Sequence, residues 1–103
     1  MTLTTPTITF AELENWKASA HNFILLDIRE LHELKQFQYQ NALHIPFTEI
    51  MQNLHRIPDN TDIIIACHLG ERSALLTNYL IRKHSKLSVF NLKGGLSPYY
   101  LQS

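Results

Sequence analysis

The middle of this sequence reads Ile63-Ile-Ile-Ala-Cys67-His-Leu-Gly70-Glu-Arg72-Ser73. Its first four residues are strongly β-prone, and their β-branched side chains favour the centre of a sheet. From Ser73 to His84 the apolar residues recur at helical spacing, which predicts an amphipathic helix that starts immediately after Arg72. The stretch therefore predicts a central strand, a short loop that opens with Cys67, and a helix.

Strands and helices alternate through the rest of the chain. The apolar run Phe23–Leu26, closed by Asp27, is typical of a strand buried on both faces. Further short strands are predicted at Ala42–Ile45 and Val89–Phe90. Helices are predicted after Ile8, where Thr9 and Glu12 match a capping box, at Glu30–Phe37 with Leu31, Leu34 and Phe37 as a core stripe, at Phe47–Leu54, and as a short closing turn at Leu96–Leu101. This alternation predicts an α/β fold with a mostly parallel sheet of about five strands flanked by short helices.

Length and charge limit the classes of protein to which this chain can belong. A chain of 103 residues fits one domain, spanning 1–103. Nine basic and nine acidic residues give no net charge, which argues against nucleic-acid and membrane-surface partners. The apolar runs are far shorter than the roughly 20 residues that cross a bilayer. Since residues 1–10 resemble no signal peptide, a reducing, cytoplasmic location is expected.

The cysteine and histidine counts restrict the chemistry further. Cys67 is the only cysteine, so it cannot form an internal disulfide or a Cys-x-x-Cys redox couple. The six histidines do not fall at ligand spacings such as His-x3-His, so no metal site is expected. The thiol of Cys67 is therefore expected to be free.

Asp27 and Cys67 both follow predicted parallel strands. The carboxyl ends of such strands form the edge where α/β proteins bind ligands. Cys67 also comes directly before a helix N-terminus, whose unpaired N–H groups and macrodipole stabilise anions such as a thiolate. Gly70 permits a tight curve and Arg72 adds a cation. The combination favours a nucleophilic Cys67 over the alternative of a small buried core residue.

These motifs are similar to those of one known family. The stretch Cys67–Ser73 resembles the active-site loop of rhodanese-type sulfurtransferases, Cys-x-x-Gly-x-Arg-Ser/Thr. Asp27–Glu30 resembles the family's Asp-Val-Arg-Glu, with Glu33 on the acidic position that follows. Ala42–Pro46 aligns on Ala-x-Asn-Ile-Pro, and Leu92–Gly95 on Leu-x-Gly-Gly. The resemblance covers about residues 8–99.

The resemblance implies a single-domain, rhodanese-like three-layer fold and an enzyme, a thiosulfate or persulfide sulfurtransferase. Such a protein takes sulfane sulfur from a donor such as thiosulfate, holds it as a persulfide on Cys67, and passes it to a thiol, cyanide or a protein acceptor. No cofactor or metal is implied. The resemblance assigns a substrate-binding loop of His68, Leu69, Gly70, Glu71 and Arg72, with Asp27, Arg29 and Ser73 in supporting positions.

Several positions depart from the family pattern. The usual Gly-His-Ile-x-Gly is replaced by Phe37–Asn41, in which Asn41 can still occupy a left-handed turn, and Tyr99 stands where Trp is common. Glu71 partly offsets Arg72, which weakens the expected attraction for dianionic thiosulfate. For Asp27 and Arg29, a purely structural pair is as well supported as a role in the site. Arg29 and Glu33 also have the i, i+4 spacing of a helical ion pair.

Two other functions remain possible from the sequence. One is a non-catalytic sulfur-carrier or protein-interaction module that uses the same loop. The other is a phosphatase or arsenate reductase, whose loops have the pattern Cys-x5-Arg. The present loop is Cys-x4-Arg, and its smaller ring of N–H donors favours a sulfur atom over a phosphoryl group. The sequence leaves the oligomeric state open.

Overall fold

A five-stranded sheet, with every neighbouring pair parallel, forms the centre of the computed structural model, which describes residues 5–100. The strand order is β1-β5-β4-β2-β3. The strands are β1 (Thr7–Ile8), β2 (Phe23–Asp27), β3 (Leu43–His44), β4 (Asp62–Ala66) and β5 (Ser88–Leu92). β4 is the central strand, as its β-branched run predicts, and Ala66 at its end lies opposite Asp27 at the end of β2.

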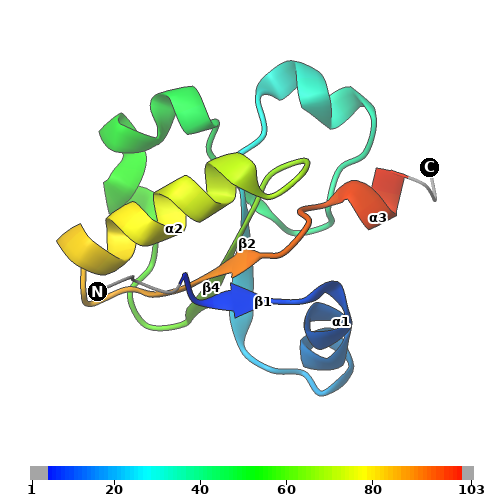
Figure 1. Ribbon diagram of the computed structural model, residues 1–103, viewed down its shortest axis with the longest axis horizontal. Helices are drawn as coiled ribbons and strands as arrows, with labels where there is room; N and C mark the ends of the chain where they lie inside the picture. The colour runs from blue at the N-terminus through cyan, green and yellow to red at the C-terminus, as the bar shows by residue number, and fades with distance from the viewer. Residues whose placement is uncertain (1–4, 101–103) are drawn as a thin grey trace.

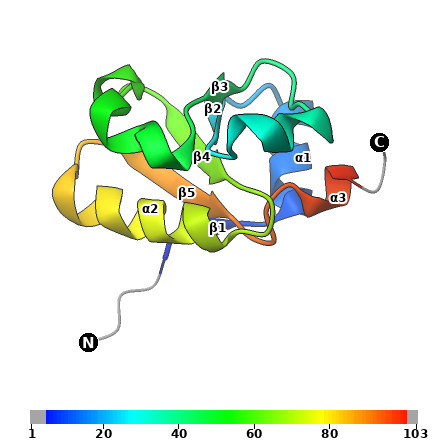
Figure 2. The ribbon, with the colours of Figure 1, turned by 90° about the horizontal axis from the view of Figure 1, so that it is seen from above.

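Helices cover both faces of the sheet. They are α1 (Phe10–Ala18), α2 (Glu71–Lys83), α3 (Ser97–Tyr100) and the 3₁₀ helices η1 (Leu31–Lys35) and η2 (Phe47–Arg56). Figures 1 and 2 show α2 and η2 together on one side of the strands and α1 on the other. The predicted α/β three-layer arrangement is therefore confirmed.

Side-chain alternation along β4 explains the two cores. Ile63 and Ile65 pack into the core beneath α2 and η2, whereas Ile64 and Ala66 pack into the core that includes α1. Successive side chains of a strand point to opposite faces. Cys67 continues the series, belongs to the α2 core, and is thereby directed toward the N-terminal end of that helix.

The capping box predicted for the first helix is present. Thr9 Oγ1 accepts the Glu12 backbone N–H at 3.1 Å, and the Glu12 carboxylate accepts the Thr9 N–H at 2.9 Å. Two N–H groups that lack helical partners are thus satisfied. Asn41 has a φ of 65°, which confirms the predicted left-handed turn.

The segment after β2 differs from its prediction. Instead of an α-helix over Glu30–Phe37 there is a short 3₁₀ helix, η1, and Leu31 is 72% exposed. The core stripe proposed for this segment is therefore wrong at Leu31. η1 ends at Lys35, so Phe37 lies beyond the helix and the three apolar side chains do not form a stripe on one helix. η2 is likewise 3₁₀, with non-helical backbone angles at Asn53.

Other element boundaries shift by a few residues. α2 begins at Glu71 rather than after Arg72, because Gly70 in a left-handed conformation serves as its N-cap. β5 extends beyond the predicted Val89–Phe90, and β1 was not predicted as a strand because two residues carry no periodicity. The closing helix ends at Tyr100, and the Leu101 end of its prediction lies outside the described residues. Over residues 5–100, no helix is long and apolar enough to cross a membrane.

Candidate active site

The thiol of Cys67 lies at the end of β4, with only 1% of the residue exposed. Its Sγ accepts the backbone N–H of Gly70 at 3.1 Å, so the loop curls around the sulfur. This curl needs Gly70 at φ 97°, a conformation that L side chains rarely adopt. The loop directs an N–H donor at the sulfur, an arrangement that stabilises negative charge there.

The turn Gly94-Gly95 packs against the backbone of the loop that begins at Cys67. Leu96 N–H donates to the Cys67 carbonyl at 2.9 Å. A Cβ atom at Gly95 would lie 2.3 Å from the His68 carbonyl oxygen and 2.5 Å from that of Cys67. The backbone of the loop can approach this closely only because Gly95 has no side chain.

Gly95→Ala should therefore lower the free energy of unfolding by about 2–4 kcal/mol, from the clash with two carbonyl oxygens and the cost of a left-handed Ala. Gly94→Ala is a matched control, since it has a similar φ of 75° but nothing within 4 Å of its Cβ, and should cost only about 1–2 kcal/mol. Urea unfolding of both variants measures the difference. Equal losses of stability in the two variants would contradict the close approach of the loop backbone to Gly95.

Two buried polar side chains, Ser73 and Asn91, connect the thiol to strand β5 by hydrogen bonds. The Ser73 hydroxyl lies 3.4 Å from Cys67 Sγ and donates to Asn91 Oδ1 at 2.5 Å. Ser73 is fully buried and Asn91 is 8% exposed. The predicted strand stopped at Phe90, so Asn91 was missed. The available signal was a polar residue that interrupts the apolar run from Val89 to Leu92.

Arg72 is held by a carboxylate from another element. Its Nη1 and Nη2 donate to the two oxygens of Glu33 in η1 at 2.7 and 2.9 Å. The hydrogen bond from Arg72 is the main cause that lowers the pKa of Glu33 to about 2, against the opposing effect of burial. The same pair raises the pKa of Arg72. The predicted pairing of the Arg29 and Glu33 side chains is therefore wrong. The Glu33 carboxylate also neutralises most of the positive charge that Arg72 was expected to place beside the thiol.

The Glu33–Arg72 pair makes stability depend on acid pH. The pKa of Glu33 in the folded chain is about 2, well below the usual value of 4.5 for a glutamate. The ion pair's contribution to the free energy of unfolding is therefore complete above about pH 4.5 and is lost as the pH falls toward 2. After discounting for partial exposure, we expect this contribution to be about 1–2 kcal/mol.

Glu33→Gln should accordingly be less stable at neutral pH and lose less stability on acidification than the unaltered chain. Urea unfolding at a series of pH values from 7 to about 2 measures both effects. Glu49→Gln, an exposed substitution on η2, controls for the general effect of removing a carboxylate. Parallel stability curves for the unaltered chain and Glu33→Gln would contradict the pair's role.

Asp27 and Arg29 form a buried ion pair that does not bond to Cys67. Arg29 Nη2 donates to Asp27 Oδ2 at 2.7 Å and to the Phe37 carbonyl at 2.8 Å. Burial opposes a charged Arg29, but hydrogen bonds to Asp27 and Tyr100 outweigh it and raise its pKa. Arg29 Nη1 donates to the Tyr100 hydroxyl at 2.8 Å, and the Tyr100 ring stacks on His68 with centroids 4.1 Å apart. The pair thus reaches the loop through Tyr100, which the sequence did not single out.

The remaining loop residues lie at the rim. Leu69 is 57% exposed, and Glu71 is exposed in the first turn of α2. A carboxylate in this turn interacts favourably with the positive end of the helix dipole and reduces its effect on other anions. The structure therefore brings the predicted loop together around Cys67. The sulfur receives a backbone N–H donor from Gly70, and little net positive charge lies beside it.

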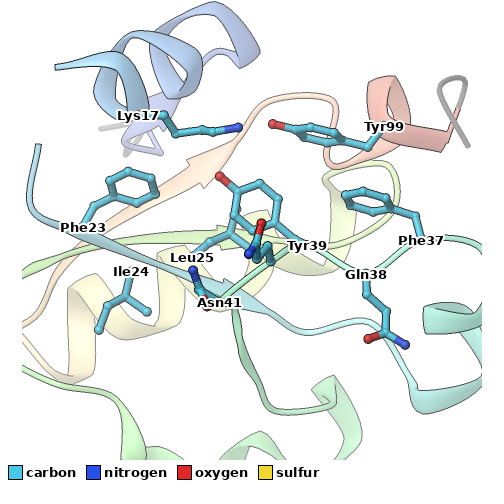
Figure 3. A pocket seen from close by; sticks show the side chains of 10 residues that line it. Lys17, Phe23, Ile24, Leu25, Phe37, Gln38, Tyr39, Asn41 and Tyr99 are labelled. Atoms are coloured by element: carbon cyan, nitrogen blue, oxygen red, sulfur yellow. The ribbon is translucent and has the colours of Figure 1, made fainter. Parts of the chain in front are cut away.

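A separate cleft of about 580 Å³ lies on the α1 side of the molecule (Figure 3). Its wall includes the segment 37–41, which departs from the family pattern, together with Lys17 and Tyr99. Lys17 Nζ lies 5.6 Å from the centroid of the Tyr39 ring. No residue of the loop 67–72 lines this cleft, so it is distinct from the thiol site.

Comparisons with known proteins agree with these motifs. The family model of the rhodanese-like domain matches residues 9–102. A sulfurtransferase of Allochromatium vinosum is 33% identical over 79 residues, which cover 77% of this chain and 73% of that protein. YrkF of Bacillus subtilis, named as a candidate sulfur carrier protein, is 26% identical over 91 residues, and the chain spans about half of its length, 49%.

Solved structures place the fold in the same group. A rhodanese-like domain protein from Staphylococcus aureus has a TM-score of 0.81 and 29% identity, and the match covers 89% of this chain and 88% of that one. A rhodanese-related protein from Thermoplasma volcanium has a TM-score of 0.82 at 22% identity, over 95% of this chain and 93% of that one. With the family model matching nearly its whole length, this chain belongs to the rhodanese-like domain family.

Proposed function

We propose that this chain is a sulfurtransferase that carries sulfane sulfur on Cys67. The observation that carries the proposal is the hydrogen bond from Gly70 N–H to Cys67 Sγ, inside a loop that leads into the N-terminus of α2. Such a loop stabilises a thiolate and an attached sulfur atom. The similarity to the Allochromatium sulfurtransferase supports the same activity.

The proposed reaction has two displacement steps at sulfur. In the first, the Cys67 thiolate attacks the sulfane sulfur of the donor, and the donor's bond to that sulfur breaks. Its electron pair leaves on the donor, as sulfite from thiosulfate or as a thiolate from a persulfide. In the second, a nucleophilic acceptor attacks the outer sulfur, and the electron pair of the S–S bond returns to Cys67. The cycle closes without an external oxidant or reductant.

The charges around the loop favour donors of low charge. Arg72 is paired with Glu33, and Glu71 lies in the first turn of α2, so dianionic thiosulfate gains little attraction. A persulfide on a thiol carries less charge, and its carbon chain can contact the exposed Leu69. We therefore expect a persulfide donor to load Cys67 faster than thiosulfate at equal concentration.

A non-catalytic sulfur carrier is the second candidate, and the similarity to YrkF favours it. A carrier would form the same Cys67 persulfide but would not turn over repeatedly. Release of many equivalents of product per protein, with donor and acceptor both in excess, identifies an enzyme. Release of one equivalent identifies a carrier.

Intact-mass spectrometry tests the proposal directly. The protein is incubated with thiosulfate, mercaptopyruvate or an alkyl persulfide, and then challenged with cyanide or a thiol. The expected result is a mass gain of one sulfur atom that the challenge removes. Failure of every donor to load the protein, or rapid hydrolysis of an aryl phosphate, would overturn the sulfurtransferase proposal. Negligible phosphatase activity is expected, because the Cys-x4-Arg loop has too small a ring for a phosphoryl group.

A further inference from the structure

Cys67, Ser73 and Asn91 form a buried hydrogen-bond chain in which two acceptors compete for the proton of the Ser73 hydroxyl. The Ser73 hydroxyl has a single hydrogen to donate and lies within reach of both Cys67 Sγ, at 3.4 Å, and Asn91 Oδ1, at 2.5 Å. Asn91 comes from β5 and Ser73 from α2, so the chain links the sulfur to an element that carries none of the loop residues.

The observed arrangement suits a protonated thiol. Ser73 donates to Asn91 Oδ1, and its oxygen can then accept the S–H of Cys67. A thiolate needs the opposite direction, because it can only accept. Ser73 must then donate to Sγ, and the short contact with Asn91 becomes favourable only if the amide turns over and its Nδ2 donates to Ser73.

We propose that Asn91 is a positioning residue that, through Ser73, sets the balance between thiol and thiolate at Cys67. The orientation of the amide decides whether the Ser73 proton is available to the sulfur. When the thiol ionises, its proton goes to solvent, the Ser73 hydroxyl rotates toward Sγ, and the Asn91 amide reverses. This inference rests on the proposed function only for its consequence, because the thiolate is the form that attacks the sulfur donor.

Other charged groups also lie around the loop that holds the thiol. They are Arg72 of α2 with its partner Glu33 of η1, Glu71 and His68 in the loop, and the Asp27–Arg29 pair at the end of β2. The substitutions below leave all of them unaltered. A change in the thiolate fraction can then be assigned to the buried chain.

Two substitutions of Asn91 should move the thiolate in opposite directions. Asn91→Asp presents only acceptor oxygens when ionised and adds a negative charge, so it should keep the Ser73 proton and favour the thiol. Asn91→Leu removes the competing acceptor, so Ser73 should donate to the sulfur and favour the thiolate. Each change should shift the midpoint of the thiolate titration by about one pH unit, a tenfold change in thiolate fraction below the midpoint.

The experiment measures the rate of iodoacetamide alkylation of Cys67 against pH, with thiolate ultraviolet absorbance as a second readout. The expected result is a higher midpoint for Asn91→Asp and a lower one for Asn91→Leu. Asn91→Ala serves in place of Leu if the larger side chain prevents folding. A role limited to packing would leave the midpoint of every folded variant unchanged, and that result would overturn the proposal. So would a rise in the apolar variants.

The Ser73→Ala background provides the control. Without the hydroxyl, Asn91→Leu or Asn91→Ala should no longer shift the midpoint, because the link to Cys67 is lost. A shift that persists in this background would also overturn the proposal. These readouts need no sulfur donor. A chain that alkylates as expected but never loads sulfur would refute the proposed function and leave the positioning role in place.

Discussion

Cys67→Ser should abolish sulfur loading, lowering the rate of transfer by at least about a thousandfold, because an alcohol cannot replace the thiolate as a sulfur nucleophile. Stability should change little. A Ser hydroxyl at this position can accept the Gly70 N–H and bond to Ser73, as the sulfur does. Intact-mass analysis after incubation with an alkyl persulfide measures loading, and circular dichroism confirms the fold.

Thr77→Ser is a suitable control for this experiment. Thr77 is buried in α2, and its hydroxyl donates to the Ser73 carbonyl at 2.7 Å rather than to the sulfur. The substitution keeps that hydroxyl and should preserve loading. Transfer by folded Cys67→Ser at the rate of the unaltered chain would show that the nucleophile has been wrongly assigned.

Arg29→Met should lower the free energy of unfolding by about 3–5 kcal/mol. The substitution leaves the Asp27 carboxylate buried without its partner, at 2% exposure. It also removes the donors to the Phe37 carbonyl and the Tyr100 hydroxyl. Urea or thermal unfolding measures the loss.

Two comparisons interpret this loss. Arg56→Met makes the same chemical change at an exposed position on η2 and should cost less than about 0.5 kcal/mol. The double substitution Asp27→Asn with Arg29→Met should recover part of the lost stability, because no charge is then left unpaired. A loss no larger than that of Arg56→Met would contradict the importance of the buried pair.

Sulfur loading distinguishes the two roles left open for Asp27 and Arg29. Tyr100→Phe removes the hydroxyl that Arg29 contacts but keeps the ring that stacks on His68. Tyr100→Leu removes both. Slower loading in the Phe variant than in the unaltered chain, at equal stability, would support a role of the pair in holding the loop, and a further loss in the Leu variant would report the ring stacked on His68. Unchanged loading in both would leave the ion pair a purely structural one.

The sequence by itself determined the order of the helices and of all strands except β1, together with the position of the thiol. Ile63–Ala66 could only be a central strand, since a β-branched apolar run is stable when both faces are covered. Cys67 then had to fall at the carboxyl edge of the sheet, and Gly70 had to supply the tight curve. These features depend on local pattern and on spacing along the chain, which a sequence displays directly.

The tertiary structure alone decided which side chains meet around that thiol. Glu33 pairs with Arg72 of α2, which is far away in the sequence, rather than with Arg29 four residues away. Asn91 of β5 likewise accepts a hydrogen bond from Ser73 of α2. Charge and hydrogen-bond groups are compatible with many partners, and only the packing of the elements selects among them. The Gly70 N–H that donates to Cys67, and the neutralised Arg72 beside it, are therefore properties of the folded sheet and helices together.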